Sequence, residues 1–340
     1  TFPGTFPGIL DDACLVGRGE TNLLEGTSIF VCGPMDGAED ALLDMCGPCA
    51  ELSHFSALVN VVITIKPHKG ITSAEFSKVA VQTGVRVAHD LARVTEGKTA
   101  DSSETFALSP VIQEEDSLRA LPRIAYVYFL YSHGDLRDML VYGKNTRELH
   151  PTLIHPNEVM DGAIVWEGYS RPTMNVTYDQ LNNGVIRSLF EEHGKTMNFV
   201  ATILANHHKL FAEKELNANQ IASLARDVLG VDGVVITKDG GGQADTDLML
   251  TCERCEELGI RTTIMAMEYA GDGGSSEGSL ADVSSRADAI VSLGNCAEMI
   301  TLPRVERIVG GERLKDYDYD PREKLEVPYN KMPGPINFFG

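Results

Sequence analysis

The segment GVVITKDGGGQADTDLMLTCERCEEL, residues 233–258, places a short apolar run, a glycine-rich turn and a helical pattern in direct succession. The run Gly233–Thr237 has the length of a strand buried on both faces, and Asp245–Leu258 carries apolar residues at helical spacing. Similar runs and helical patterns alternate on both sides of this segment. Such alternation predicts an α/β fold with a doubly wound, mainly parallel sheet.

The strands expected in this sheet are short apolar runs rich in β-branched and aromatic residues. They are Ile124–Tyr131, Ala163–Val165, Phe199–Leu204, Gly233–Thr237, Thr262–Ala266 and Ala289–Ser292. A further helical pattern at Asn219–Leu229 lies between two of these runs. We therefore expect helices to cross over between neighbouring parallel strands.

The N-terminal part of the chain has a smaller α/β pattern of its own. Ser28–Cys32 and Leu58–Ile65 are strand candidates, and Ser73–Ala92 is a helical pattern with Thr72 and Glu75 at its start. The polar, acidic segment that follows is bounded by proline, which suits a junction. The sequence predicts two α/β lobes: an N-terminal lobe (1–95), a linker (96–121), a C-terminal domain with a substrate crevice (122–310) and a C-terminal extension (311–340).

Composition narrows the class of protein. The 340 residues are 43% hydrophobic, which supplies enough apolar material for a globular interior. Asp and Glu number 49 against 29 Lys and Arg, and the resulting net charge of −20 repels phosphate backbones and anionic membranes. No apolar run approaches the roughly 20 residues of a membrane-spanning helix, and the N-terminus has no signal-peptide pattern. We expect a soluble, cytoplasmic protein that binds neither nucleic acid nor membrane.

Polar side chains follow three of the expected parallel strands. Gly241 and Gly242 precede Asp245 and Asp247 directly after one strand, while Glu268 and Asn295 end the next two. The carboxyl ends of parallel strands open at one edge, where glycines allow close approach and a helix N-terminus offers free N–H groups. The sequence therefore predicts a crevice that binds a small amine or quaternary ammonium compound. The alternative is a glycine-rich turn in which Asp245 caps the helix.

The cysteines and histidines give weaker signals. Cys46 and Cys49 have the spacing of a thiol redox pair, but no buried strand is expected before them. Cys252 and Cys255 share one face of the expected helix and suit packing as small hydrophobic residues. A zinc site built from both pairs is an alternative, but nothing in the sequence brings them together, and we predict no metal site. A histidine near the crevice could act as an acid or base, although the pattern selects none.

Several segments resemble the proprotein-derived α/β subunit of component B of glycine, sarcosine and betaine reductases. The likeness runs in order over residues 6–310, and its most specific parts are Pro156–Ile164 and the block 240–282. The other matching segments are Phe6–Gly8, Tyr126–Phe129, Val141–Gly143 and Leu181–Asn183. The resemblance implies an oxidoreductase subunit that cleaves the C–N bond of a small amino acid or betaine-type amine. It also implies a hetero-oligomer in which a partner subunit receives the fragment on selenocysteine or cysteine.

The resemblance extends the substrate-binding candidates to Glu158 and Asp161, and it raises the question of a pyruvoyl cofactor. In that family a precursor cleaves itself before a cysteine, and the resulting pyruvoyl carbonyl withdraws electrons from the substrate amine. The matching stretch 165–171 has no cysteine here, and Ser170 stands about where it would be. The sequence favours an intact chain over a serine-derived pyruvoyl. It thereby favours a betaine-like substrate, whose cationic leaving group needs no such carbonyl.

Two other interpretations of the function remain open. A non-catalytic binding or scaffold subunit could keep the fold after losing the reactive group, which the altered stretch 165–171 favours. A thiol redox protein would instead use Cys46 and Cys49.

Overall fold

The fold was taken from a computed structural model. It describes residues 6–33, 45, 50, 54–113, 115–132, 138–166, 176–238, 242–268, 282–295, 298–302 and 325–329. In this part of the chain no helix has both the length and the apolar character needed to cross a membrane.

The largest element is a six-stranded sheet with the order β11-β10-β9-β3-β8-β6. Its strands are β3 (Arg123–Leu130), β6 (Thr152–Ile154), β8 (Asn198–Asn206), β9 (Gly233–Thr237), β10 (Arg261–Glu268) and β11 (Ile290–Asn295). All neighbouring pairs are parallel except β6 with β8, which is antiparallel at the edge. The predicted doubly wound, mainly parallel sheet is confirmed.

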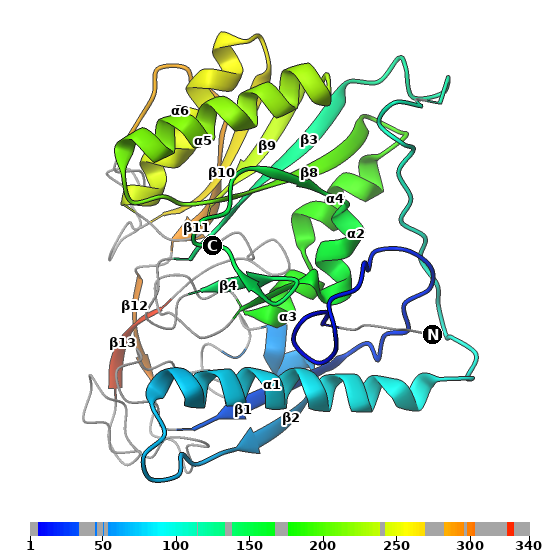
Figure 1. Ribbon diagram of the computed structural model, residues 1–340, viewed down its shortest axis with the longest axis vertical. Coiled ribbons are helices and arrows are strands. Elements are labelled where there is room, and N and C mark those ends of the chain that lie inside the picture. Colours follow the sequence, from blue (N-terminus) through cyan, green and yellow to red (C-terminus); the bar gives the residue numbers. More distant parts are fainter. Residues whose placement is uncertain are drawn as a thin grey trace.

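Helices cover both faces of this sheet. On one face, α5 (Phe211–Ser223) and α6 (Gln243–Glu257) lie side by side, as Figure 1 shows, and pack on the alternate residues Ala125, Val127 and Phe129 of β3. On the other face, α4 (Gly184–Glu192) packs against a core that includes Tyr126, Tyr128 and Leu130. Successive side chains of a strand point to opposite faces, so β3 is buried on both.

A small antiparallel sheet adjoins the second core. It consists of β4 (Met139–Val141), β5 (Lys144–Asn145) and β7 (Ile164–Trp166). The expected strand Ala163–Val165 therefore exists but belongs to this sheet and not to the parallel one. The short helices α2 (Pro156–Glu158) and α3 (Thr177–Leu181) flank β7, and a π-type turn at Val159–Ala163 leads into it.

The N-terminal lobe contains a two-stranded parallel sheet and one long helix. The strands are β1 (Thr27–Cys32) and β2 (Val59–Thr64), and the helix is α1 (Ser73–Ala92), which Figure 1 shows running across the strands. The predicted capping residues are confirmed, because the Glu75 N–H donates to Thr72 Oγ1 (3.3 Å) and the Thr72 N–H donates to Glu75 Oε2 (2.9 Å). A small core that includes Phe6, Val85 and Val165 joins α1 to β7.

The described residues of the segment 96–121 form no helix or strand, yet they pack against the C-terminal domain. The ring centres of Phe106 and Phe190 of α4 are 5.1 Å apart, and the Arg187 side chain donates a hydrogen bond to Glu104 Oε2 at 2.7 Å. In the predicted extension 311–340 the structure describes β13 (Leu325–Tyr329), which pairs with β12 (Glu298–Leu302) in an antiparallel hairpin. The predicted domain boundaries stay a prediction.

Candidate functional site

The order of the parallel strands identifies the edge at which a ligand is expected. Along the chain the first parallel strand is β3; the next, β8, adds on one side of it, and the later strands β9, β10 and β11 add on the other. The connections therefore diverge between β3 and β9, and in open α/β sheets ligands bind outside the carboxyl ends of the strands at such a point. The residues at this rim are Ser132 after β3, Asn206 and His207 at the end of β8, and Lys238 after β9.

Asp245 lies in the first turn of α6, directly above the end of β9. Its carboxylate forms an ion pair with Lys238, and both side chains are almost completely buried, at 0% and 1% exposure. The residue before α6 is Gly242, so Asp245 does not cap the helix. A lysine of the chain itself thus pairs with the carboxylate that the sequence places in the substrate crevice, and the substrate-binding role of Asp245 stays a prediction.

Asp247, two residues further along α6, joins α6 to α5 and to the end of β8. Its Oδ2 accepts from Lys214 Nζ of α5 and lies 3.2 Å from Nδ1 of His207. Lys214 also donates to the carbonyl oxygen of Gln243 at 2.9 Å. The exposed fractions of the three side chains are 5% or less. A buried charge needs such pairing, since removing it from water is costly.

His207 is held in place on both sides. Its ring stacks on Phe129 with 4.9 Å between ring centres, and its Nδ1 faces Asp247. Burial lowers the pKa of His207, and the hydrogen bond to Asp247 only partly opposes this. The ring is therefore neutral at pH 7. The proton lies on Nδ1, where the carboxylate can accept it, and Nε2 is left as an acceptor.

Two asparagines extend this network across the rim. Asn206 Nδ2 donates to the carbonyl oxygen of His207 (2.9 Å) and, at 3.4 Å, to those of Ser132 and Arg147. Asn217 of α5 donates from Nδ2 to the carbonyl oxygen of Asn206 at 3.1 Å. The ends of β3 and β8 and the first half of α5 are thus fixed by buried side chains.

The glycine-rich turn lies beside this network. Gly242 is exposed with φ of +70°, and a Cβ built there would meet no atom within 4 Å. Gly242 is therefore open to solvent at a helix start that has no side-chain cap. Gly241 lies outside the described residues.

The other two strand ends lie at the same edge. Glu268 of β10 pairs with Asn295 of β11 in parallel register, and β10 is parallel to β9. The backbones are thus gathered as the sequence predicts. The side chains of Glu268 and Asn295 lie outside the described part of the structure, so their role stays a prediction.

Glu158 and Asp161 belong to a different place in the fold. Glu158 accepts from the Tyr142 hydroxyl and, at 2.9 Å, from the N–H of His155. Asp161 accepts from the Gly17 N–H at 3.0 Å and from Thr21 Oγ1 at 2.7 Å. Burial raises the pKa of Asp161, and the hydrogen bonds from Thr21 and Gly17 oppose that shift.

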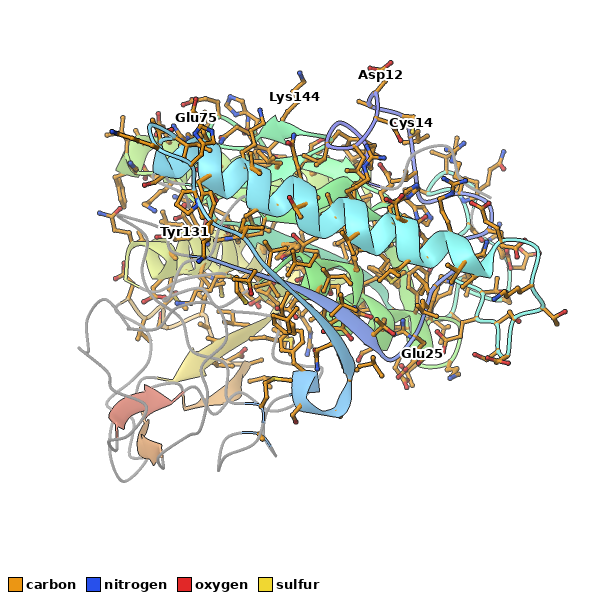
Figure 2. All side chains as sticks on the ribbon, turned by 90° about the horizontal axis from the view of Figure 1, so that it is seen from below. Asp12, Cys14, Glu25, Glu75, Tyr131 and Lys144 are labelled. Carbon is orange, nitrogen blue, oxygen red and sulfur yellow. The ribbon has the colours of Figure 1, made fainter. Side chains whose placement is uncertain are left out.

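These contacts fasten the N-terminal segment 6–26 to the turn before β7. Figure 1 shows this segment, in dark blue, beside α2 and away from α5 and α6. In Figure 2, Asp12 and Cys14 of this segment lie apart from Tyr131, which follows β3 at the rim. Among the described residues, the hydrogen-bond partners of Glu158 and Asp161 include none of the rim residues Asp245, Asp247 and His207. The structure does not bring the two pairs of carboxylates together.

The residues considered for covalent or thiol chemistry are only partly described. Ser170, Cys46 and Cys49 lie outside the described residues. The chain enters and leaves the stretch around Ser170 at Trp166 and Thr177, where the Trp166 N–H donates to Thr177 Oγ1 at 3.1 Å. Trp166 pairs with Met139, whose N–H donates to Ser132 Oγ (2.8 Å) at the end of β3. The stretch thus starts and returns near the rim.

The second cysteine pair packs as expected. Cys252 and Cys255 are buried in the core between α6 and the sheet, and both are free thiols. Burial raises the pKa of Cys255 to about 12, so its thiol stays protonated and unreactive at pH 7.

Sequence reasoning did not select Lys214, Asn217, Lys238 or Asn206, and it left His207 undecided. The sequence contained one signal for Lys214 and Asn217. Lys214, Asn217 and Ile221 follow one another at helical spacing, so the stripe of α5 that faces the core contains two polar residues. Polar residues on a buried stripe indicate a functional or structural network.

Comparison with known proteins identifies the family of the chain. The family described as "Glycine/sarcosine/betaine reductase component B subunits" matches residues 3–319. The chain is 39% identical over 308 residues to "Glycine reductase complex component B subunits alpha and beta" of Acetoanaerobium sticklandii, covering 90% of this chain and 71% of that protein. No solved structure matches the chain.

Two relatives from Peptoclostridium acidaminophilum are named after the other two substrates, sarcosine and betaine. "Sarcosine reductase complex component B subunit alpha" is 33% identical over 90% of this chain and 71% of its own length. "Betaine reductase complex component B subunit alpha" is 31% identical over 90% of this chain and 70% of its own length. With a family match over nearly all of its length and relatives of this similarity, the chain belongs to the glycine/sarcosine/betaine reductase component B family.

Proposed function

We propose that this chain is a subunit of a glycine, sarcosine or betaine reductase-type complex and that it binds a small amino acid or betaine-type amine at the rim of its sheet. The C–N bond of that substrate breaks, and the bonding electron pair leaves with the nitrogen. A selenolate or thiolate of a partner subunit supplies the electron pair for the new bond to carbon. The chain thus acts in a hetero-oligomeric oxidoreductase.

The buried charges at the rim carry this proposal. Lys238 and Lys214 place two ammonium groups where the strand connections diverge, with Asp245 and Asp247 as their counter-ions. A zwitterionic amino acid offers the same two charges in reverse, so its carboxylate can approach a lysine while its nitrogen approaches the aspartate and histidine side. Preorganised charges in a buried site interact more strongly than the same charges in water.

A pyruvoyl group is the cofactor that the family resemblance implies. The stretch 165–171 offers Ser170 as its only source, in place of a cysteine, and a serine hydroxyl can make the same acyl shift. Trp166 within this stretch and Thr177 beyond it lie near the end of β3, which supports a place at the rim for a group formed between them. When present, its carbonyl would withdraw electrons from the substrate nitrogen. Trp166 and Thr177 would fix the ends of the segment that carries it.

Intact-mass measurement of the purified chain tests the cofactor. Two fragments, of which one has a carbonyl-reactive N-terminus at position 170, support the pyruvoyl. A single species of full mass removes it from the proposal and leaves the binding role at the rim.

A non-catalytic scaffold subunit is the second candidate. It is favoured by the missing cysteine in 165–171 and by the neutralisation of Asp245 and Asp247 inside the chain. A scaffold would need the fold and the partner surfaces but not the rim network.

The reconstituted complex decides between the two. We expect release of ammonia or an amine from glycine, sarcosine or glycine betaine, with a dithiol as reductant, to require both this chain and its partner subunit. The substitution Lys238→Met keeps the length of the side chain and removes its charge, so turnover should fall by about a hundredfold or more. Turnover that is unchanged in Lys238→Met, with complex assembly intact, contradicts a catalytic rim and favours the scaffold.

A matched control is available on the surface. Lys195 lies in the exposed turn after α4, away from the rim, and Lys195→Met makes the same chemical change. We expect its turnover to equal that of the unmodified complex.

A further inference from the structure

One group of buried atoms at the rim has hydrogen-bonding capacity that the described residues leave unused. His207 Nε2, Asp247 Oδ1, Asn206 Oδ1 and Asn217 Oδ1 are all inaccessible to solvent, and none has a hydrogen-bond partner within the described part of the chain. Their residues are 0 to 2% exposed. Leaving such a group unpaired costs about 1 to 3 kcal/mol, so buried polar groups in native proteins nearly always have partners.

The four residues form one continuous network. Asn217 donates to the backbone of Asn206, Asn206 donates to the backbone of His207, and His207 faces Asp247. These contacts link the four residues at the ends of β8, α5 and α6.

All four unused atoms are acceptors. For each asparagine, Nδ2 donates to carbonyl oxygens, which can only accept, so Oδ1 cannot exchange places with it. Asp247 Oδ1 belongs to the carboxylate that pairs with the Lys214 ammonium, so it is an acceptor as well. His207 carries its proton on Nδ1 toward Asp247, which makes Nε2 an acceptor too.

Among the residues that the structure describes, no donor is left in the network to balance these acceptors. Lys214 Nζ already donates to Asp247 Oδ2 and to the carbonyl oxygen of Gln243, and Lys238 is paired with Asp245. A group that satisfies the site must therefore bring several N–H or O–H donors. It must also be small, because all four residues are buried.

We propose that His207, Asp247, Asn206 and Asn217 form the subsite for the nitrogen of a small primary or secondary amine, with the N–H groups of the ligand donating to these acceptors. This inference rests on the proposed function and deepens it, because it places the nitrogen of the substrate and selects its class. A quaternary ammonium group has no N–H and leaves the acceptors unpaired. A site built to hydrogen-bond its ligand rejects an analogue that lacks the donor by large factors.

The aromatic residues of the rim agree with this selection. Proteins bind quaternary ammonium groups over the faces of aromatic rings. Here the face of Phe129 is covered by His207, with the rings nearly parallel at 9°. The subsite therefore favours glycine or sarcosine, in contrast to the betaine-like substrate that the sequence favoured.

Binding of simple amines to the full-length chain tests the proposal directly. Methylammonium chloride and tetramethylammonium chloride are titrated by calorimetry at constant ionic strength, so that charge is equal and only the N–H donors differ. We expect methylammonium to bind at least about tenfold more tightly than tetramethylammonium. Equal affinity for the two ions, or no binding of methylammonium at all, overturns the proposal and leaves ordered water as the partner of the acceptors.

A pair of variants on α5 locates the binding. Asn217→Leu removes one acceptor at nearly constant size, and Asn219→Leu makes the same change at an exposed position of the same helix. We expect Asn217→Leu to abolish the preference for methylammonium and Asn219→Leu to retain it. Preference that survives in a folded Asn217→Leu protein overturns the assignment. If that variant does not fold, Asn217→Asp, which keeps an acceptor at the position, must retain the preference.

The outcome separates this inference from the proposed function. If the chain prefers methylammonium but the reconstituted complex shows no turnover, the subsite is supported and the reductase role is contradicted. If the complex turns over glycine betaine as fast as glycine and the chain shows no preference for methylammonium, the reductase role is supported and the subsite is contradicted.

Discussion

Two pairs of carboxylates, similar in sequence context, have different tasks in the folded chain. Asp245 and Asp247 follow a glycine-rich turn at the rim of the parallel sheet and are paired with Lys238 and Lys214. Glu158 and Asp161 lie around α2 and the π-type turn, and their partners are hydroxyl and N–H groups.

The two pairs of carboxylates differ in the hydrogen-bonding capacity that remains unused. Asp161 accepts with both oxygens, and the N-terminal segment supplies both donors. Asp247 uses Oδ2 alone, and Oδ1 stays buried without a partner among the described residues. A carboxylate whose hydrogen bonds are complete holds the fold together, whereas one with unused capacity beside a neutral histidine can receive a ligand.

The largest expected effect comes from removing the rim carboxylate. Asp247→Ala leaves the buried ammonium of Lys214 without its counter-ion, and we expect the free energy of unfolding to fall by about 3 to 5 kcal/mol. Urea denaturation followed by circular dichroism measures this change.

The double variant Asp247→Asn with Lys214→Met provides the check. It removes both charges at similar size, so most of the lost stability should return. An Asp247→Ala protein that is as stable as the unmodified chain would contradict the buried ion pair.

A smaller effect is expected at the second pair. Asp161→Ala removes the acceptor for Gly17 and Thr21, which should lower the free energy of unfolding by about 1 to 3 kcal/mol. The N-terminal segment should then detach locally, so that trypsin cleaves more rapidly after the exposed Arg18. Limited proteolysis with mass spectrometry measures the rate.

Asp161→Asn keeps one acceptor oxygen and should show an intermediate rate. The comparison between the two regions would fail if Asp161→Ala abolished amine binding while Arg18 stayed protected.

The smallest effect is a pH dependence at the rim. Burial lowers the pKa of His207 in the folded state, and the charges of Lys214 and Lys238 add to this, whereas Asp247 opposes it. The unfolded chain therefore binds a proton first as the pH falls. His207 therefore costs stability progressively as the pH drops below about 6.5, down to its folded pKa, and has no effect above that range.

Comparing the unmodified chain with His207→Gln isolates this contribution, since burial also lowers the pKa of His155 and His193 and would affect both proteins equally. The stability difference between the two should change between pH 7 and pH 5. A difference that is constant over this range would show that folding does not change the pKa of His207, and it would contradict the lowering by burial.

The parts of the fold that depend on local pattern were predictable. Ser73–Ala92 forms a helix with the expected Thr72 and Glu75 contacts, because a capping box and an apolar stripe are both local signals. Ala163–Val165 was assigned to the wrong sheet, since a three-residue strand carries no information about its partner.

The start of α5 was missed for a reason connected with the site. The helix begins at Phe211, well before the expected Asn219, because the buried Lys214 and Asn217 interrupt its apolar stripe. The candidate aspartates were found from the glycine-rich turn, but their lysine partners were not. Lys214 is distant in sequence, and Lys238 precedes the turn, so the ion pairs form only when α5, β9 and α6 come together.

The central position of β3 has a consequence for biosynthesis. Its sequence RIAYVYFL is the first strand of the sheet to leave the ribosome, yet its neighbours β8 and β9 follow only after β4 to β7 and several helices. Until then an aromatic, β-prone segment has both of its edges unpaired, which favours aggregation of the nascent chain. Expression of this protein should therefore benefit from chaperones that bind extended apolar segments, and slow translation before Asn198 should lower its yield.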